Sequence, residues 1–375
     1  MKILLTGGGT GGHVYPLFAI AEEINRIADE EKLLHLKIYF ASDSVYDRDE
    51  LERQFITYVP VTAGKLRVKF SIRVIWDMFK MAIGVIRALF TIFRIYPDVV
   101  ISKGGYVSFP VLFAAKLLRI PVIIHESDTV PGRVNIWAGK FAKKVALSFS
   151  EAASYFKKEK VSVTGQPVRR SILNVAKEAA YKYFELDPEV PTVGIFAGSQ
   201  GAKVVNDAIL RILPDLIQRY QVLHQTGPKN FEEIKSDVGV ILGEDIKRTR
   251  YRPFPFLNDV QTKMFGAAST VIVGRSGSSL FEIAAWGKPS ILVPYALAHG
   301  DHQRKNAYHY ARSGACEVIE EANLTPSVLM HEIDNIVGNL ERYNTMASRA
   351  KAFFKDDAAR EIAIEAVKIG LEHEK

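Results

Sequence analysis

The stretch LLTGGGTGGHVYP, residues 4–16, joins a short apolar segment to a run of glycines and then to a histidine. Its five glycines stand at positions 7, 8, 9, 11 and 12, and His13 follows them directly. The pattern predicts a strand over Lys2–Thr6, a glycine turn, and a helix over Pro16–Ala28. Glycine lets the backbone approach an anion closely, and the first turn of a helix offers unpaired N–H groups and a positive dipole end. We therefore expect the first strand–turn–helix unit of an α/β domain, with an anion site at the turn.

The same alternation of strand-like and helix-like segments continues along the chain, which favours parallel sheets built from βαβ units. The segment TGQPVRRS, residues 164–171, indicates a linker, and a second series begins at PTVGIFAGSQGAKVVNDAIL, residues 191–210. We predict an α/β protein with two Rossmann-like parallel-sheet domains, residues 1–166 and 167–355, and a C-terminal helix at about 356–375 that packs back on the first domain. Further elements of the first domain are expected at Leu36–Ala41, Ser71–Arg94, Asp98–Ser102, Pro121–His125, Val145–Leu147 and Val161–Thr164.

The composition narrows the class of protein. The chain has 375 residues, of which 48% are hydrophobic and 24% charged, as expected for a packed globular protein of two domains. The single cysteine, Cys316, excludes an intramolecular disulfide and a cysteine-based metal site. The first apolar run, Ile3–Leu5, is too short for a signal peptide, so we expect a cytoplasmic protein.

Four glycine turns follow predicted strands, at residues 7–12, 102–108, 197–202 and 274–279. In parallel sheets such turns meet the ligand at the carboxyl ends of the strands. Gly7, Gly9 and Gly12 also match the dinucleotide fingerprint, with Asp43 as the ribose-binding acid, but this match is weak by itself. No turn carries the Gly-Lys-Ser/Thr ending of a Walker A motif. Together the turns favour a ligand with phosphate groups.

His13 is the candidate proton acceptor. The dipole at a helix N-terminus disfavours the imidazolium form, so a neutral ring could act as a general base. The alternative is a histidine that only caps or packs the helix. Glu126, at the end of the strand Pro121–His125, could orient His13 or contact a substrate hydroxyl, whereas His125 itself is expected to be structural.

The segment between Lys65 and Arg94 carries seven basic residues and one acid. Arg73, Lys80, Arg87 and Arg94 recur every seven residues and form one stripe on the predicted helix. Trp76 and Phe79 lie among the apolar residues of the same helix. An ordinary amphipathic domain helix is one interpretation, and a helix that dips into an anionic membrane surface is the other. Nucleic acid is disfavoured because no nucleic-acid-binding module accompanies the segment.

An ordered set of motifs is similar to the MurG family, the GT-B glycosyltransferases of peptidoglycan synthesis. The motifs are GGTGGHVYP, KGGYVS, HES, GQPVR, GSQGA, RSG before EIAAWGKPSILVPY, and DHQRKNA, and the likeness runs from about residue 3 to 310. The resemblance implies two domains facing a central cleft. It also implies transfer of N-acetylglucosamine (GlcNAc) from UDP-GlcNAc to the MurNAc of undecaprenyl-pyrophosphoryl-MurNAc-pentapeptide (lipid I), at the inner face of the cytoplasmic membrane.

The resemblance also assigns roles residue by residue. His13 would be the catalytic base, with Glu126 beside it, and Tyr106 would belong to the acceptor and membrane side together with Arg73, Trp76, Phe79, Lys80 and Arg87. Donor-binding roles fall on Thr10, Gly11, Gly12, Asp128, Arg169, Ser199, Gln200, Leu257, Ser276, Gly277, Glu282, Gln303 and Asn306. Asp128 departs from the amide that the family often has, and a carboxylate near a diphosphate is repelled unless it is paired.

The implied mechanism is a single displacement with inversion at the anomeric carbon. No D-x-D dyad suited to a diphosphate-bound metal is found, so neither a metal nor another cofactor is expected, although a divalent cation could stimulate. Three alternatives remain open: a UDP-GlcNAc 2-epimerase on the same two-domain plan, a glycosyltransferase acting on diacylglycerol, and a non-catalytic nucleotide-binding protein. The basic apolar helix counts against the epimerase, which needs no membrane surface.

Overall fold

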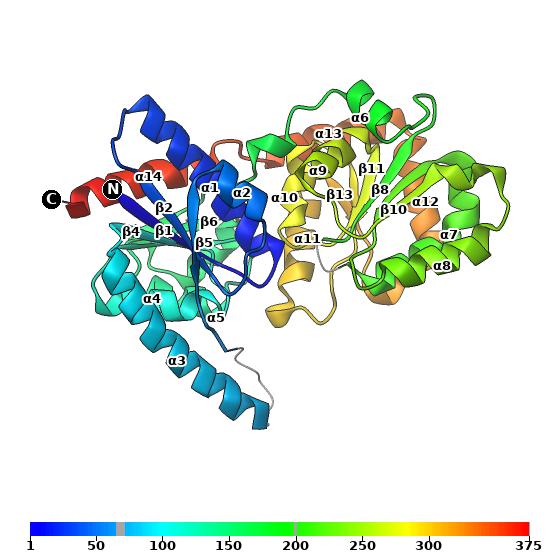
Figure 1. Ribbon diagram of the computed structural model, residues 1–375. Coiled ribbons are helices and arrows are strands. Elements are labelled where there is room, and N and C mark those ends of the chain that lie inside the picture. The colour runs from blue at the N-terminus through cyan, green and yellow to red at the C-terminus, as the bar shows by residue number, and fades with distance from the viewer. Residues whose placement is uncertain (65–71, 199–200, 375) are drawn as a thin grey trace. The chain divides into compact units, whose positions relative to one another are not determined.

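The computed structural model describes residues 1–64, 72–198 and 201–374 (Figure 1). Contacts along the chain divide it into two compact units. Unit 1 contains residues 1–169 and 355–375, and unit 2 contains residues 170–354. Each unit is built on one parallel sheet, so the expected pair of Rossmann-like domains is confirmed.

Unit 1 has a seven-stranded sheet in the order β3-β2-β1-β4-β5-β6-β7, with every described strand pair parallel. The chain starts in the middle of this sheet and extends it first to one side and then to the other. The strands are β1 (Lys2–Thr6), β2 (Lys37–Ser42), β3 (Ile56–Pro60), β4 (Val99–Ser102), β5 (Val122–Glu126), β6 (Lys144–Leu147) and β7 (Val161–Ser162). The helices are α1 (Gly11–Glu30), α2 (Arg48–Arg53), α3 (Ile72–Ile95), α4 (Ser108–Leu117), α5 (Arg133–Gly139) and α14 (Ala358–Glu374).

Unit 2 repeats the plan with six parallel strands in the order β10-β9-β8-β11-β12-β13. The strands are β8 (Thr192–Phe196), β9 (Gln221–Gln225), β10 (Tyr251–Phe254), β11 (Val271–Gly274), β12 (Ser290–Leu292) and β13 (Cys316–Val318). The helices are α6 (Lys177–Tyr183), α7 (Lys203–Arg219), α8 (Phe231–Leu242), α9 (Asp259–Ala268), α10 (Ser279–Ala285), α11 (His302–Ala311), α12 (Pro326–Val337) and α13 (Leu340–Phe353).

Two edge strands and one helix start differ from the sequence-based expectation. β3 and β10 were not expected, because both are short and each contains a proline, a residue that seldom occurs inside a strand. Helix α1 begins at Gly11, within the glycine turn, and not at Pro16, which lies inside the helix. The turn itself therefore forms the first residues of the helix.

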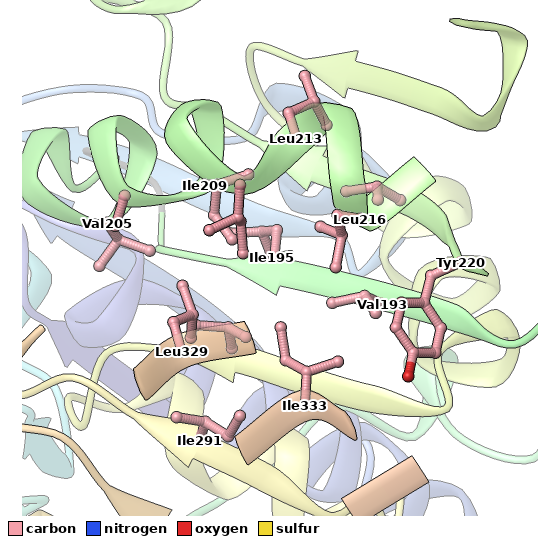
Figure 2. Packing of buried hydrophobic residues seen from close by; sticks show 14 of the residues in the cluster. Val193, Ile195, Val205, Ile209, Leu213, Leu216, Tyr220, Ile291, Leu329 and Ile333 are labelled. Atoms are coloured by element: carbon pink, nitrogen blue, oxygen red, sulfur yellow. The ribbon is translucent and has the colours of Figure 1, made fainter. Parts of the chain in front are cut away.

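The parallel sheet of unit 2 is covered by helices on both faces. Figure 2 shows Val193 and Ile195 of β8 packed with the apolar side of α7 and with Leu329 and Ile333 from α12, which cover one face of the sheet. On the other face, Gly194 lies against Phe265 of α9. Strands buried on both faces have continuous apolar sequences, as β8 and β11 do. In unit 1, α14 packs against α1 and adds apolar side chains to the core next to β1.

No helix in the described part of the chain combines the length and the apolar character needed to cross a bilayer.

Candidate active site

In unit 1, the loops after β1, β2, β4 and β5 emerge at one edge of the sheet, because these four parallel strands are neighbours. The glycine turn after β1 lies against the loop after β2: a Cβ on Gly8 would come within 2.6 Å of Ser42 Oγ and 3.1 Å of Asp43 Oδ1. Glycine is therefore required at this position for steric reasons. The close packing brings the side chains of the neighbouring loops to the start of α1.

His13 is the third residue of α1, and its imidazole is held by Thr10, the residue before the helix. The Thr10 hydroxyl lies 2.9 Å from His13 Nδ1, and His13 N–H donates to Thr10 O at 3.1 Å. On the opposite side of the ring, a Cβ on Gly105 would lie 3.7 Å from His13 Nε2. The tautomer that donates Nδ1–H to the hydroxyl leaves a lone pair on Nε2, as a general base requires.

Glu126, the last residue of β5, is buried and has its own set of partners. Its Oε1 accepts from the backbone N–H of Asp128 at 3.0 Å, and its Oε2 accepts from Gly132 N–H at 3.0 Å and from Asn135 Nδ2 at 2.9 Å. Burial raises the pKa of this carboxyl, and the neighbouring Asp128 raises it further. These bonds commit Glu126 to the loop between β5 and α5, and they favour a role in shaping that loop over the expected role beside His13.

Lys103, directly after β4, was missed in the sequence. Its side chain is 3% exposed, and its Nζ donates to Ser127 Oγ. Burial lowers the pKa of Lys103 to about 8, while the carboxylates of Glu126 and Asp128 oppose that shift. The signal that could have revealed it is a lysine at the end of a buried strand, next to two glycines. His125, as expected, is a buried structural residue, with Nε2 at 3.0 Å from Gly165 O.

Tyr106 and Arg169 are held by neighbours within unit 1. The Tyr106 hydroxyl donates to Asp43 Oδ2 at 2.9 Å, and burial together with this bond raises the pKa of Tyr106 to about 12. One oxygen of Asp43, the acid that the dinucleotide interpretation assigns to a ribose, therefore already accepts a hydrogen bond from a tyrosine. Arg169 is buried, and its guanidinium carbon lies 3.6 Å from the centroid of the Tyr15 ring on α1.

In unit 2, α11 is joined by two hydrogen bonds to the loop after β11 and by one to the loop after β12. Ser276 Oγ donates to Gln303 O at 2.7 Å, and Asn306 Nδ2 donates to Ser276 O at 3.0 Å. Gln303 Oε1 accepts from Tyr295 N–H at 3.0 Å, and its Nε2 lies 3.8 Å from where a Cβ on Gly277 would be. The structure thus brings four of the sequence-predicted donor-binding residues together.

The remaining predicted positions fall into three groups. Glu282, partly buried, lies in the first turn of α10, and Leu257 is buried in the loop between β10 and α9. Gly11 and Gly12 open α1. Ser199 and Gln200 lie outside the residues that the structure describes.

A second polar group missed in the sequence is buried beside the start of α7. His224 on β9 is 2.9 Å from Asn206 Oδ1 through Nε2 and 2.9 Å from the Tyr251 hydroxyl through Nδ1. Burial lowers the pKa of His224 to about 3, so this imidazole is neutral. Asn206 in turn donates to Thr226 O at 2.9 Å and ties α7 to the loop after β9.

Comparison with known families decides the class of protein. Residues 3–147 match the glycosyltransferase family 28 N-terminal domain, and residues 192–362 match the glycosyltransferase family 28 C-terminal domain. The chain belongs to glycosyltransferase family 28. A relative from Lactiplantibacillus plantarum is 34% identical over 365 residues, which cover 96% of this chain and 98% of the relative. It is named UDP-N-acetylglucosamine–N-acetylmuramyl-(pentapeptide) pyrophosphoryl-undecaprenol N-acetylglucosamine transferase, as is a Listeria welshimeri relative at 33% identity over 98% of this chain and 99% of its own.

Solved structures share the fold of this family 28 chain. MurG from Acinetobacter baumannii has a TM-score of 0.70 at 23% sequence identity, and the match covers 98% of this chain and 99% of the MurG chain. UDP-GlcNAc 2-epimerase from Neisseria meningitidis, bound to UDP-GlcNAc, has a TM-score of 0.67 at 14% identity, and the match covers 98% of this chain and 100% of the epimerase chain. At these identities the structures establish the fold, and both classes of enzyme have it.

Helix α3 of the family 28 chain turns one face inward and one outward. Met81, Ala88 and Ile92 are buried, and a Cβ on Gly84 would overlap the carbonyl of Thr62. The outward face carries aromatic and basic side chains: the Trp76 and Phe79 rings stack at 5.9 Å, and Lys80 Nζ lies 5.8 Å from the Trp76 ring. The exposed aromatic, basic and large apolar members of this face are Trp76, Phe79, Lys80, Ile86, Arg87, Phe90, Phe93 and Arg94, while the Arg73 side chain lies outside the part that the structure describes.

Among the described residues, no three His, Cys, Asp or Glu side chains gather as a metal site would require. The expectation that no metal is needed stays a prediction.

Proposed function

We propose that this chain transfers GlcNAc from UDP-GlcNAc to the 4-hydroxyl of MurNAc in lipid I and so forms lipid II for peptidoglycan synthesis. The observation that carries the proposal is the near-complete coverage of relatives named for this transfer, at 33–34% identity. The hydrogen bonds that surround the predicted site residues in each unit support it.

In the proposed reaction, His13 Nε2 takes the proton from the MurNAc 4-hydroxyl while that oxygen forms a bond to the anomeric carbon of GlcNAc. The bond from the same carbon to the β-phosphate oxygen breaks, and UDP leaves with the electron pair. Attack on the face opposite the leaving group inverts the α-linked donor to a β-1,4 product. The Thr10 hydroxyl supports this role because it can hold the imidazole in the required tautomer.

The donor is assigned to the loops of unit 2. Glu282 would accept hydrogen bonds from the ribose hydroxyls, and Leu257 would pack on the uracil. Gln303 Oε1 already accepts from Tyr295 N–H, so its Nε2 is the group we assign to a GlcNAc hydroxyl. Arg169, together with Ser199 and Gln200 of the segment that precedes α7 in the sequence, would stabilise the charge that develops on the leaving UDP.

The 2-epimerase is the alternative with the same fold, and sequence separates the two. The Neisseria meningitidis epimerase is 14% identical to this chain, less than half the identity of the named transferases. An epimerase also has no use for an apolar and basic outer face, since both its substrate and its product are water-soluble.

The outward face of α3 supports a peripheral site on the inner face of the plasma membrane. Aromatic side chains on an amphipathic helix enter the interface of a bilayer, while Lys80 and Arg87 would meet anionic lipid. A lipid-linked acceptor remains in that bilayer, so the enzyme has to dock on it. Localisation at the membrane is part of this proposal.

The test is transfer of radiolabelled GlcNAc from UDP-GlcNAc to a short-chain lipid I analogue, with diacylglycerol and no-acceptor controls. Label in the lipid I product supports the proposal. Label in a diacylglycerol product alone would assign the chain to lipid glycosylation, and UDP-ManNAc or UDP formed without acceptor would assign it to the epimerases. No reaction in any arm would overturn the proposal.

A further inference from the structure

The loop that follows β12 carries the backbone N–H group that orients Gln303. Gln303 Oε1 accepts from Tyr295 N–H at 3.0 Å, and its backbone O accepts from Ser276 Oγ at 2.7 Å. A side-chain amide has one end that accepts hydrogen bonds and one end that donates them. Because Tyr295 N–H binds the acceptor end, the direction of Gln303 Nε2 depends on where the loop holds that N–H group.

Two charged side chains hold this loop on either side of Tyr295. Arg275, the residue after β11, donates from Nη1 to Val293 O at 2.9 Å. Glu321, shortly after β13, accepts at Oε2 from Ala296 N–H at 3.1 Å. The guanidinium carbon of Arg275 also lies 5.5 Å from the centroid of the Tyr295 ring. The loop is therefore anchored both before and after the Tyr295 N–H group.

Arg275 and Glu321 are also tied to each other. Arg275 Nη2 lies 2.7 Å from Glu321 Oε1, and both side chains are largely buried. Removal of one partner from a buried ion pair leaves the other charge uncompensated, which is strongly destabilising. Each partner uses a further atom for the loop backbone, so a displacement of either side chain disturbs both anchors of the loop.

We infer that Arg275 and Glu321 are positioning residues for the sugar of the donor, because their ion pair fixes the loop after β12 and this loop directs Gln303 Nε2 toward a hydroxyl of the sugar. The inference rests on the proposed function, which assigns that hydroxyl to Gln303. Neither charged side chain touches the substrate in this assignment, since both act through the backbone of the loop. Loss of the pair should therefore weaken binding of the sugar and spare binding of the nucleotide.

Binding of UDP-GlcNAc and of UDP, measured by calorimetry without acceptor, separates the sugar from the nucleotide. Glu321 is the residue to vary, because Arg275 adjoins Ser276 and Gly277 of the predicted donor site. Glu321→Ala should weaken UDP-GlcNAc binding about tenfold, the effect of one lost hydrogen bond to the sugar, and should change UDP binding by less than about twofold. Equal losses for the two ligands, or no loss for either, would overturn the inference.

Two further variants control for folding and for charge. Glu321→Gln keeps an oxygen for Ala296 N–H but lacks the charge, so its loss of UDP-GlcNAc affinity should lie between those of the wild type and Glu321→Ala. It carries the same comparison if Glu321→Ala does not fold. Glu317→Ala removes an acid of β13 that lies 2.6 Å from Arg342, and both affinities should stay within about twofold of the wild type. A loss in Glu317→Ala as selective as that in Glu321→Ala would contradict the assigned role.

A double-mutant cycle with Gln303→Ala shows whether Glu321 acts through Gln303. Gln303→Ala removes the same sugar contact, so adding Glu321→Ala to it should weaken UDP-GlcNAc binding by less than about twofold. Additive losses would overturn the inference. A wild type that binds UDP-GlcNAc with this coupling, but transfers no sugar to lipid I, would reject the proposed function and keep the inference. Transfer to lipid I together with additive losses would keep the proposed function and reject the inference.

Discussion

At the scale of single residues, the hydroxyl of Thr10 contacts the imidazole of His13. Thr10 stands at the N-cap position of α1, yet its side chain makes no capping hydrogen bond to the helix backbone. Its oxygen lies instead against His13 Nδ1. An N-cap threonine ordinarily satisfies an amide of the first turn, so this departure indicates that the residue serves the imidazole.

The prediction at this scale concerns Thr10 and His13 together. His13→Ala should lower kcat by about 10² to 10⁴, the range for a lost general base, and leave UDP-GlcNAc affinity unchanged. Thr10→Val keeps the shape of the side chain but removes the hydroxyl, so kcat should fall about tenfold, since about 1.4 kcal/mol of tautomer and orientation preference is lost. Thr10→Ser is the matched control and should keep most of the activity. Steady-state kinetics, together with a direct measurement of donor binding, would test both effects on kcat. A Thr10→Val enzyme with normal kcat would show that the hydroxyl does not orient the imidazole of His13.

Site residues that stand within a sequence motif could be predicted. Contacts between side chains from different strands or helices could not. His13 and Tyr106 stand inside glycine motifs that are visible in the sequence. The partners of Glu126 were not foreseen, because Asn135 reaches it from the next helix and the contact depends on how the loop turns. Lys103 was missed because its burial and its bond to Ser127 follow from the pairing of β4 with β5.

At the scale of elements, the sequence predicted both ends of α3 to within one residue. It did not predict which side chains of the helix are buried and which are exposed. The seven-residue spacing of the cations was visible, whereas apolar residues occupy most of the remaining positions and hide the inward stripe. In the structure Met81, Ala88 and Ile92 are buried, whereas Phe90 and Phe93 are exposed. Edge strands β3 and β10 were missed for a related reason, since a short strand on one side of a sheet has a weak pattern of its own.

Reversal of charge on α3 tests whether its outer face binds membrane. Lys80→Glu together with Arg87→Glu should lower partition onto vesicles rich in anionic lipid about 30-fold or more at low salt, since each cation contributes about 1 kcal/mol near such a surface. Sedimentation with vesicles measures the partition. Lys182→Glu with Lys235→Glu, two exposed lysines of unit 2, changes the net charge equally and should leave binding nearly intact. Equal losses in the two variants would show that net charge alone, and not α3, drives binding.

At the scale of the whole molecule, the chain leaves unit 1 after Arg169 and returns to it at Lys355. The last helix, α14, places Ile362, Ala366 and Ile369 in the core that contains β1 and α1. Figure 1 shows α14 beside α1 and the strands of unit 1. Unit 1 is therefore completed only when the C-terminal segment has been made, and its stability depends on residues nearly 200 positions beyond Arg169.

Two substitutions on α14 separate the contribution of its buried face from that of its exposed ion pairs. Ile362 is fully enclosed, so Ile362→Ala should lower the free energy of unfolding by about 3 kcal/mol through lost burial and the cavity that remains. Glu372 on the same helix pairs with Lys143 at 2.7 Å, with both side chains largely exposed, so Glu372→Gln should leave the unfolding midpoint unchanged. Urea unfolding of the full chain, followed by circular dichroism, measures both.

A small effect of Ile362→Ala would mean that unit 1 holds its fold without α14, and deletion of residues 355–375 would then leave a folded unit 1. If α14 completes the core, that deletion should instead yield a protein in which unit 2 retains its secondary structure while unit 1 unfolds at a lower urea concentration than in the intact chain.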